Sequence, residues 1–168
     1  TYDLVIAGGG FAGLALGLAL SQTFDGDMRI AVVDPGPLGA PARGSKALPA
    51  DARAIALAAA SQRLLASIGV WDDLAAYAQP VTGIDITDSS LDDGIRPVLL
   101  RYDNILDDGA AGTYILENAR LLDALHKAAG MAATAAPPKL ARACAPIRSL
   151  RSVSLPAPVC SPASWPLA

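Results

Sequence analysis

The sequence predicts an α/β fold that begins with a parallel strand–helix–strand (βαβ) unit and carries an inserted antiparallel hairpin. Three observations support this fold class. A glycine-rich turn joins a short apolar segment to a helix-forming segment, a second apolar segment follows, and two alternating segments come later. Continuously apolar strands are typical of parallel sheets covered on both faces, whereas alternation is typical of antiparallel strands with one exposed face.

The βαβ unit occupies the first 34 residues. An apolar strand over residues 3–7 ends in Gly8-Gly9-Gly10, and residues 11–23 form an uninterrupted helix pattern. After a turn, residues 29–34 are apolar up to a terminal Asp34 and predict a second, buried strand.

A loop and a second helix are predicted next. Residues 35–49 contain four prolines and three glycines, which is typical of a loop. Asp51 is placed to cap a helix that runs through residues 55–68 and ends at Gly69. Residues 71–77 add about two further helical turns.

The inserted hairpin follows from period-2 alternation. Residues 81–88 alternate and can pair with residues 97–102 across a polar turn. A short strand is then expected over residues 113–116, and a helix over residues 118–129 that Gly130 closes.

The composition changes abruptly after residue 130. All 15 glycines and all 16 acidic residues lie in residues 1–130, whereas residues 131–168 hold seven of the 13 prolines, both cysteines and four basic residues. This final segment has neither the helical nor the strand period of a packed element. We expect residues 1–130 to be the folded portion and residues 131–168 to be a disordered or out-of-frame tail, so the chain is either a truncated or frameshifted product or a natural short form.

Composition excludes several function classes. No run approaches the ~20 apolar residues of a transmembrane helix. A net charge of −3 with one histidine argues against nucleic-acid binding. Two cysteines are too few for a disulfide framework and do not have metal-ligand spacing, so no metal is expected. Because the chain opens directly into a strand pattern without a signal peptide, we expect a cytoplasmic location.

The glycine-rich turn carries the clearest chemical signal. Gly8-Gly9-Gly10-Phe11-Ala12-Gly13 fits G-x-G-x-x-G. In that motif Gly8 makes the tight turn, Gly10 lets the backbone approach a pyrophosphate, and Gly13 allows close packing of the helix on the strand. The backbone N–H groups of the first helical turn, which includes Phe11 and Ala12, would hold the phosphates. The motif alone also fits a purely structural turn.

Asp34 favours dinucleotide binding over a structural turn. It ends the second strand, 21 residues after Gly13, where a carboxylate can accept hydrogen bonds from the hydroxyls of an adenosine ribose. The same carboxylate would repel a 2′-phosphate. The sequence therefore predicts a Rossmann-like region that binds the adenosine of FAD or NAD and not that of NADP.

Four further segments follow in a fixed order. They are D-A-R-A-I-A-L at 51–57, S-Q-R-L-L-A-S-I-G-V-W at 61–71, an alternating strand ending in Asp88, and Y-I-L-E-N-A-R-L-L at 114–122. Taken singly, these segments also fit a solvated arginine at 53, an N-cap at Asn118 and a surface charge at Arg120. Together with the glycine motif, they resemble the FAD-dependent aromatic hydroxylases, most closely the ubiquinone-biosynthesis hydroxylases of the 2-octaprenyl-6-methoxyphenol hydroxylase type.

The resemblance covers about residues 2–130 and implies a cofactor and a reaction. It implies FAD held by the glycine motif and Asp34, with Arg53 reaching the pyrophosphate or the ribityl chain. The family places an arginine directly after Glu-Asn, so Arg120, one position late, is an imperfect match to a flavin contact. The implied reaction adds one oxygen atom of O₂ to a phenol, with NADH or NADPH as electron donor. A polyprenyl-phenol substrate would imply peripheral contact with a membrane or with a ubiquinone-synthesis complex.

The chain also departs from the family. The D-G and G-D motifs that close the flavin site in these enzymes come after the segments matched here, and residues 131–168 contain neither. Two hypotheses therefore stay open. The chain is either the N-terminal portion of a flavin-dependent hydroxylase, or a non-catalytic module that binds FAD or similar nucleotides. No catalytic side chain is assigned, because the cofactor carries the chemistry in this class.

Overall fold

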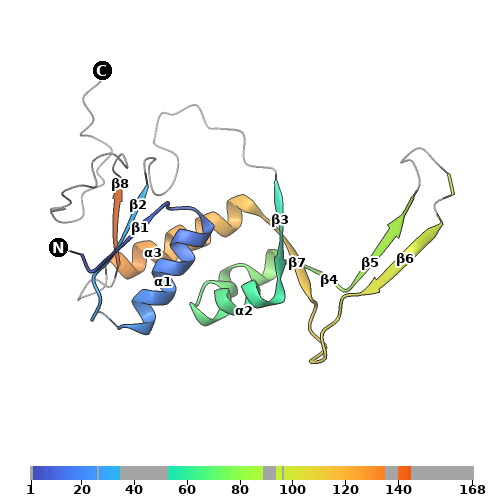
Figure 1. Cartoon of the computed structure of the whole chain (residues 1–168), viewed down its shortest axis with the longest axis horizontal. Helices are drawn as coiled ribbons and strands as arrows, with labels where there is room; N and C mark the ends of the chain where they lie inside the picture. Colours follow the sequence, from blue (N-terminus) through green and yellow to red (C-terminus); the bar gives the residue numbers. More distant parts are fainter. Residues whose placement is uncertain are drawn as a thin grey trace, which may run out of the picture.

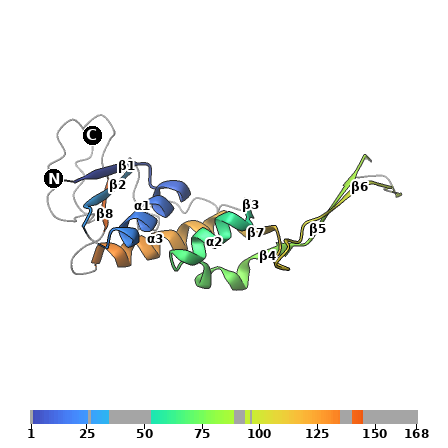
Figure 2. The ribbon, with the colours of Figure 1, turned by 60° about the horizontal axis from the view of Figure 1, so that its bottom comes forward.

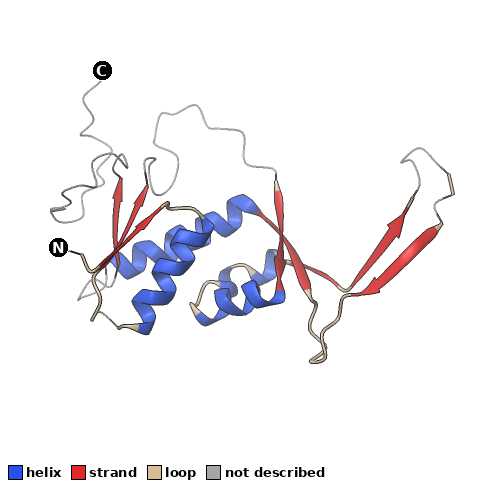
Figure 3. Ribbon diagram, viewed as in Figure 1, coloured by secondary structure: helices blue, strands red, loops and turns tan. Residues whose placement is uncertain are grey.

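A computed structural model describes residues 2–25, 27–34, 53–88, 94–95, 97–134 and 140–144. The strands of these residues form a parallel sheet, an antiparallel sheet and a two-stranded hairpin. Figure 1 and Figure 3 show the parallel sheet and its helices at one end of the molecule and the hairpin at the other. The predicted α/β class is confirmed.

The parallel sheet positions the glycine motif. It has the order β1 (Leu4–Ala7), β2 (Ile30–Asp34), β8 (Leu140–Cys144). Helix α1 (Phe11–Thr23) connects β1 to β2, as the βαβ pattern predicts. Residues 30–33 are at most 1% exposed, which explains why β2 is apolar up to Asp34.

Helices α1 and α3 (Asn118–Thr134) pack against each other and against this sheet, as the two views in Figure 1 and Figure 2 show. The core between them contains Leu14 and Leu18 from α1, Leu125 from α3 and Val32 from β2, each no more than 2% exposed. Burial of side chains of this size contributes about 1.5–3 kcal/mol each. This core fixes the first turn of α1 relative to the end of β2.

The antiparallel sheet corrects one predicted helix. Residues 54–58 form strand β3 (Ala54–Ala58), which pairs along its whole length with β7 (Thr113–Glu117); strand β4 (Gln79–Val81) pairs with the other edge of β7. Ile55 and Leu57 are spaced by two and not by the helical period, and only Leu57 of this strand is buried. The helix α2 therefore covers only Ala59–Ser67. The predicted turns over 71–77 are present as 3-10 helices η1 (Trp71–Asp73) and η2 (Ala75–Tyr77).

The predicted hairpin is confirmed as β5 (Gly83–Thr87) paired with β6 (Val98–Asp103), but Val81, predicted to begin the first strand, belongs to β4 and pairs with β7. All residues of both strands are exposed, and the hairpin projects away from the rest of the molecule (Figure 2). Residues directly opposite each other share a face, so Ile84 and Ile86 lie with Tyr102 and Leu100. An ion pair between Arg101 Nε and Asp85 Oδ1 at 2.6 Å joins the strands from the opposite face.

The predicted helix end at Gly130 also needs correction. Helix α3 passes through Gly130 and ends at Thr134, because Ala129 is fully buried and the apolar stripe of the helix continues. Residues 140–144, which the sequence assigns to an aperiodic tail, form β8 and pair in parallel with β2. Leu140 is 1% exposed and belongs to the core. The predicted loop at 35–49, the Asp51 cap, the polar turn at 89–93 and the remainder of the tail lie outside the described residues.

Within the described ranges, no helix has both the length and the apolar character needed to cross a membrane.

Candidate functional site

The glycine motif forms the turn between β1 and α1. Gly8 has a φ of +110°, which only glycine adopts without strain, and its backbone N–H donates to the carbonyl oxygen of Val33 at 2.7 Å. Gly10 is the N-cap residue of α1. The chain therefore leaves the sheet at Gly8 and enters the helix two residues later.

Gly13 allows the helix to approach this turn closely. A Cβ added at Gly13 would overlap the carbonyl oxygen of Gly8 and lie 3.0 Å from its carbonyl carbon. In contrast, a Cβ added at Gly10 meets no atom within 4 Å, so open space lies beside the backbone there. These two environments match the packing role of the last glycine and the ligand-approach role of the middle one.

The amino end of α1 is built to accept an anion. No side chain caps the helix at Gly10, and its first turn contains no acidic residue. Gly10 and Ala12 are exposed and Phe11 is half-buried. The N–H groups of a first turn have no partner within the helix, and the helix dipole is positive at this end. A phosphate group is a ligand that satisfies both features.

Asp34 lies beside the turn, at the end of β2. Its Oδ2 accepts a hydrogen bond from the backbone N–H of Gly9 at 2.7 Å, and the carboxylate is partly buried. The parallel pairing of Ala7 with Val33 brings the ends of β1 and β2 to the same edge of the sheet. Ligands of open α/β sheets bind at this carboxyl edge.

The two predicted arginines lie near the beginning of α3. Arg53 is exposed, and its carbonyl oxygen accepts a hydrogen bond from the backbone N–H of Asn118 at 3.0 Å. The Arg120 guanidinium carbon lies 3.9 Å from the centre of the Tyr77 ring, and Nε donates to Glu117 Oε2 at 2.9 Å. Arg120 is thus held between Tyr77 and Glu117.

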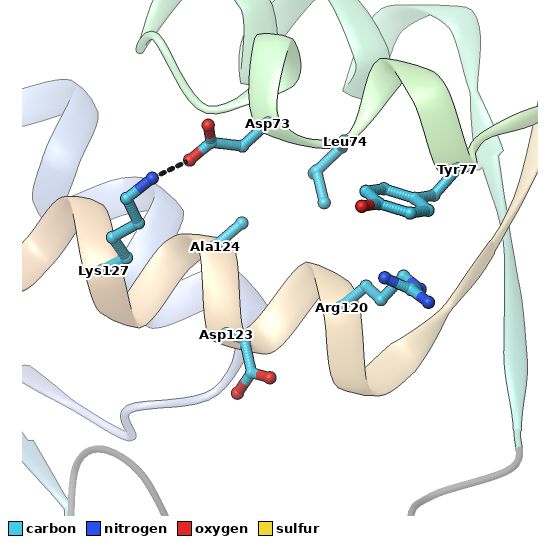
Figure 4. Close-up of a pocket in the computed structure, with 7 residues that line it drawn as sticks. All are labelled: Asp73, Leu74, Tyr77, Arg120, Asp123, Ala124 and Lys127. Atoms are coloured by element: carbon cyan, nitrogen blue, oxygen red, sulfur yellow. Dashed lines mark hydrogen bonds and ion pairs between the residues drawn. The ribbon is translucent and has the colours of Figure 1, made fainter.

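Figure 4 shows Arg120 in a cavity between α3 and the 3-10 helices. The cavity has a volume of about 220 Å³ and is lined by Asp73, Leu74, Tyr77, Arg120, Asp123, Ala124 and Lys127. Lys127 Nζ and Asp73 Oδ2 form an ion pair at 2.7 Å across it. The stacking of Arg120 on Tyr77 is a cation–π contact that local spacing in the sequence does not reveal.

Sequence reasoning also missed the roles of Gly9 and Gly17. Gly9 is buried and supplies the N–H group that Asp34 binds. A Cβ at Gly17 would lie 2.9 Å from Val32 Cγ2, so Gly17 sets the distance between α1 and the sheet. Its position four residues after Gly13, on the same side of the helix, is the signal that could have identified it.

The described part of the chain contains no candidate metal site. No group of three or more histidine, cysteine, aspartate or glutamate side chains is arranged there to hold an ion.

No protein-family model matches the sequence. A search of curated proteins finds the ubiquinone hydroxylase UbiL of Rhodospirillum rubrum, 34% identical over 123 residues, which is 73% of this chain and 26% of UbiL. The chain therefore spans about a quarter of the length of this relative.

Solved structures show a similar fold. The p-nitrophenol 4-monooxygenase PnpA from Pseudomonas putida is 17% identical with a TM-score of 0.57, over 83% of this chain and 30% of PnpA. The flavin-dependent monooxygenase PieE, solved in complex with FAD and substrate, is 21% identical with a TM-score of 0.53, over 85% of this chain and 24% of PieE.

Proposed function

Because this chain belongs to the FAD-dependent aromatic hydroxylase family, we propose that it is the FAD-binding portion of a flavin-dependent monooxygenase. The chain spans about a quarter of the length of its relative UbiL. The observation that supports this most strongly is the glycine turn, with an open approach at Gly10 and the Asp34 carboxylate beside it. The substrate we propose is a phenol, specifically a polyprenyl-phenol precursor of ubiquinone, because the relative UbiL is named a ubiquinone hydroxylase.

The residues present fit the adenosine-diphosphate half of FAD. The uncapped N–H groups at Gly10, Phe11 and Ala12 would hold the pyrophosphate, since donors at a helix amino end bind phosphate oxygens. The absence of a side chain at Gly10 leaves room for that approach. The Asp34 carboxylate would accept hydrogen bonds from the ribose hydroxyls, as acids at the end of the second strand do in this fold.

The two arginines are the proposed contacts toward the rest of the cofactor. Arg53 is exposed next to the amino end of α3, and its planar guanidinium suits a phosphate oxygen pair. To reach a flavin, the Arg120 guanidinium would have to leave both Tyr77 and Glu117. We therefore propose Arg53 as a contact of the pyrophosphate or the ribityl chain, and Arg120 as a flavin contact only after that movement.

When bound, FAD supplies the redox chemistry by which electrons from NADH or NADPH and one oxygen atom of O₂ convert a phenol to a hydroxylated product. The chain's own groups bind and orient the cofactor. The proposal places the protein in the cytoplasm, with peripheral membrane contact wherever a polyprenyl substrate is embedded in lipid.

A second function is favoured by one observation. The groups that the glycine turn and Asp34 supply suit the binding of a nucleotide and include no reacting group, so they also fit a nucleotide-binding module without catalysis. Purification of the chain in the presence of FAD distinguishes the monooxygenase from the nucleotide-binding module. Yellow protein that retains FAD and oxidises NADH or NADPH only when a phenol is present supports the monooxygenase, whereas FAD binding without oxidation supports the module. Failure to bind any adenine nucleotide contradicts both.

A further inference from the structure

Asp34 contacts the protein's own glycine turn. The backbone N–H of Gly9 donates to Asp34 Oδ2 at 2.7 Å, over a sequence separation of 25 residues. Gly9 is buried, so this N–H group cannot be satisfied by bulk water. The carboxylate is thus an acceptor for the protein's own backbone.

This hydrogen bond extends the pairing of β1 and β2 by one step. The last backbone hydrogen bond between the strands is that of the Gly8 N–H to the Val33 carbonyl oxygen at 2.7 Å. The positive φ of Gly8 then turns the chain away from the sheet. The Asp34 side chain supplies the acceptor for the following N–H group, that of Gly9, so Gly9 stays attached to the end of β2.

The position of Gly9 determines where the phosphate-binding groups point. Gly9 connects the positive-φ turn at Gly8 to the N-cap at Gly10, and no side chain caps the amino end of α1 at Gly10. Three consecutive glycines have the greatest backbone freedom of any tripeptide, so an unattached turn would sample many conformations. Holding Gly9 restricts the turn to one conformation before a ligand arrives, and preorganisation of this kind raises affinity.

We propose that Asp34 is a positioning residue for the phosphate-binding turn, in addition to its proposed contact with the ribose. This inference rests on the proposed function, because it concerns the same nucleotide site. The positioning role and the ribose contact differ in the ligands whose binding they affect. A carboxylate that only binds ribose matters only for ligands with ribose hydroxyls, whereas a carboxylate that holds Gly9 also matters for ligands without them.

Two variants separate the hydrogen bond from the charge. Asp34→Asn and Asp34→Ala both remove the negative charge near the phosphates, but only asparagine keeps an oxygen that can accept from Gly9. The probe is 2′,3′-dideoxy-ADP, which has the pyrophosphate and the adenine but no ribose hydroxyls. ADP is the comparison ligand, and Asp72→Ala, an exposed acid on η1, controls for the loss of charge elsewhere.

The proposal predicts that dideoxy-ADP binds Asp34→Ala about 2- to 10-fold more weakly than it binds Asp34→Asn, the range expected for one neutral hydrogen bond. It also predicts that the Gly9 N–H exchanges with deuterium faster in ligand-free Asp34→Ala than in Asp34→Asn. Equal affinities of the two variants for dideoxy-ADP would overturn the positioning role and leave the ribose contact intact. If the wild-type chain binds neither nucleotide, the proposed function itself fails, and the inference fails with it.

Discussion

Asp34 Oδ2 and the backbone nitrogen of Gly9 lie 2.7 Å apart at the carboxyl edge of the parallel sheet. This contact brings together the end of β2 and the turn before α1, the two parts of the chain that dinucleotide-binding sheets use for ribose and pyrophosphate. The carboxylate therefore lies next to the turn that we propose binds phosphate.

The charge of Asp34 predicts selectivity between adenine nucleotides. ADP should raise the melting temperature of the wild-type chain, whereas ADP carrying an additional 2′-phosphate should not, because that group would approach the carboxylate. A ligand present at 100 times its Kd stabilises a protein by about 2.7 kcal/mol. Thermal melts with each nucleotide provide the measurement. Equal shifts for both nucleotides would place the ribose away from Asp34.

The two glycines of the motif should respond differently to alanine. Gly13→Ala places a Cβ against the Gly8 carbonyl group, and forced overlap in a packed region costs about 1–3 kcal/mol. Gly10→Ala, the matched control, adds a Cβ in open space and should leave the ligand-free stability nearly unchanged. Urea unfolding of both variants tests this. A Gly13→Ala chain as stable as wild type would mean that α1 does not pack closely on the turn.

Strand β8 predicts a stabilising role for part of the tail. Leu140 is 1% exposed, and its side chain lies close to Gly17. Leu140→Ala should lower the free energy of unfolding by about 2–5 kcal/mol, as truncation of a buried leucine does. Leu64 is 46% exposed, so Leu64→Ala should cost less than about 1 kcal/mol. Similar small losses in both variants would show that residues 140–144 do not pack on β2 in solution.

The ion pair at the beginning of the sheet predicts a pH effect. Hydrogen bonds from the Arg29 side chain and backbone to Asp3 hold the pKa of that carboxyl far below its ordinary value of 3.8. A carboxyl with a lowered pKa stabilises the fold above its unfolded pKa, and this contribution disappears as the pH falls toward the folded pKa.

Asp3→Asn should therefore melt below wild type at pH 7, and the difference should shrink as the pH is lowered from about 4 toward 2. Thermal melts of the two proteins across this range measure the effect. A melting-temperature difference that stays constant down to pH 2 would contradict the assigned ion pair.

Local patterns predicted the parts of the fold whose partners are close in sequence. The glycine motif, helix 11–23 and the hairpin all follow from spacing within a few residues. The Asp51 cap and the apolar positions through residue 68 predict a helix that includes residues 54–58, and only pairing with β7, about 60 positions later, makes these residues a strand.

The pairing of β8 and the stacking of Arg120 also depend on partners that are far away in the sequence. Ala31 of β2 pairs with Ala141, and nothing in the alanine- and proline-rich sequence around Ala141 indicates that partner. The stacking of Arg120 on Tyr77 joins α3 to η2 across 43 positions. Long-range packing decides such contacts, so periodicity and motif spacing cannot predict them.

Calorimetric titration with FAD shows directly whether the turn at residues 8–13 forms an FAD site. We expect saturable binding of one FAD per wild-type chain, and no detectable binding to Gly10→Val, whose side chain would occupy the space where the pyrophosphate approaches. The Gly10→Val chain should melt close to wild type, because that space is open in the protein. Absence of FAD binding to wild type, or equal binding to Gly10→Val, would mean that this turn does not hold FAD.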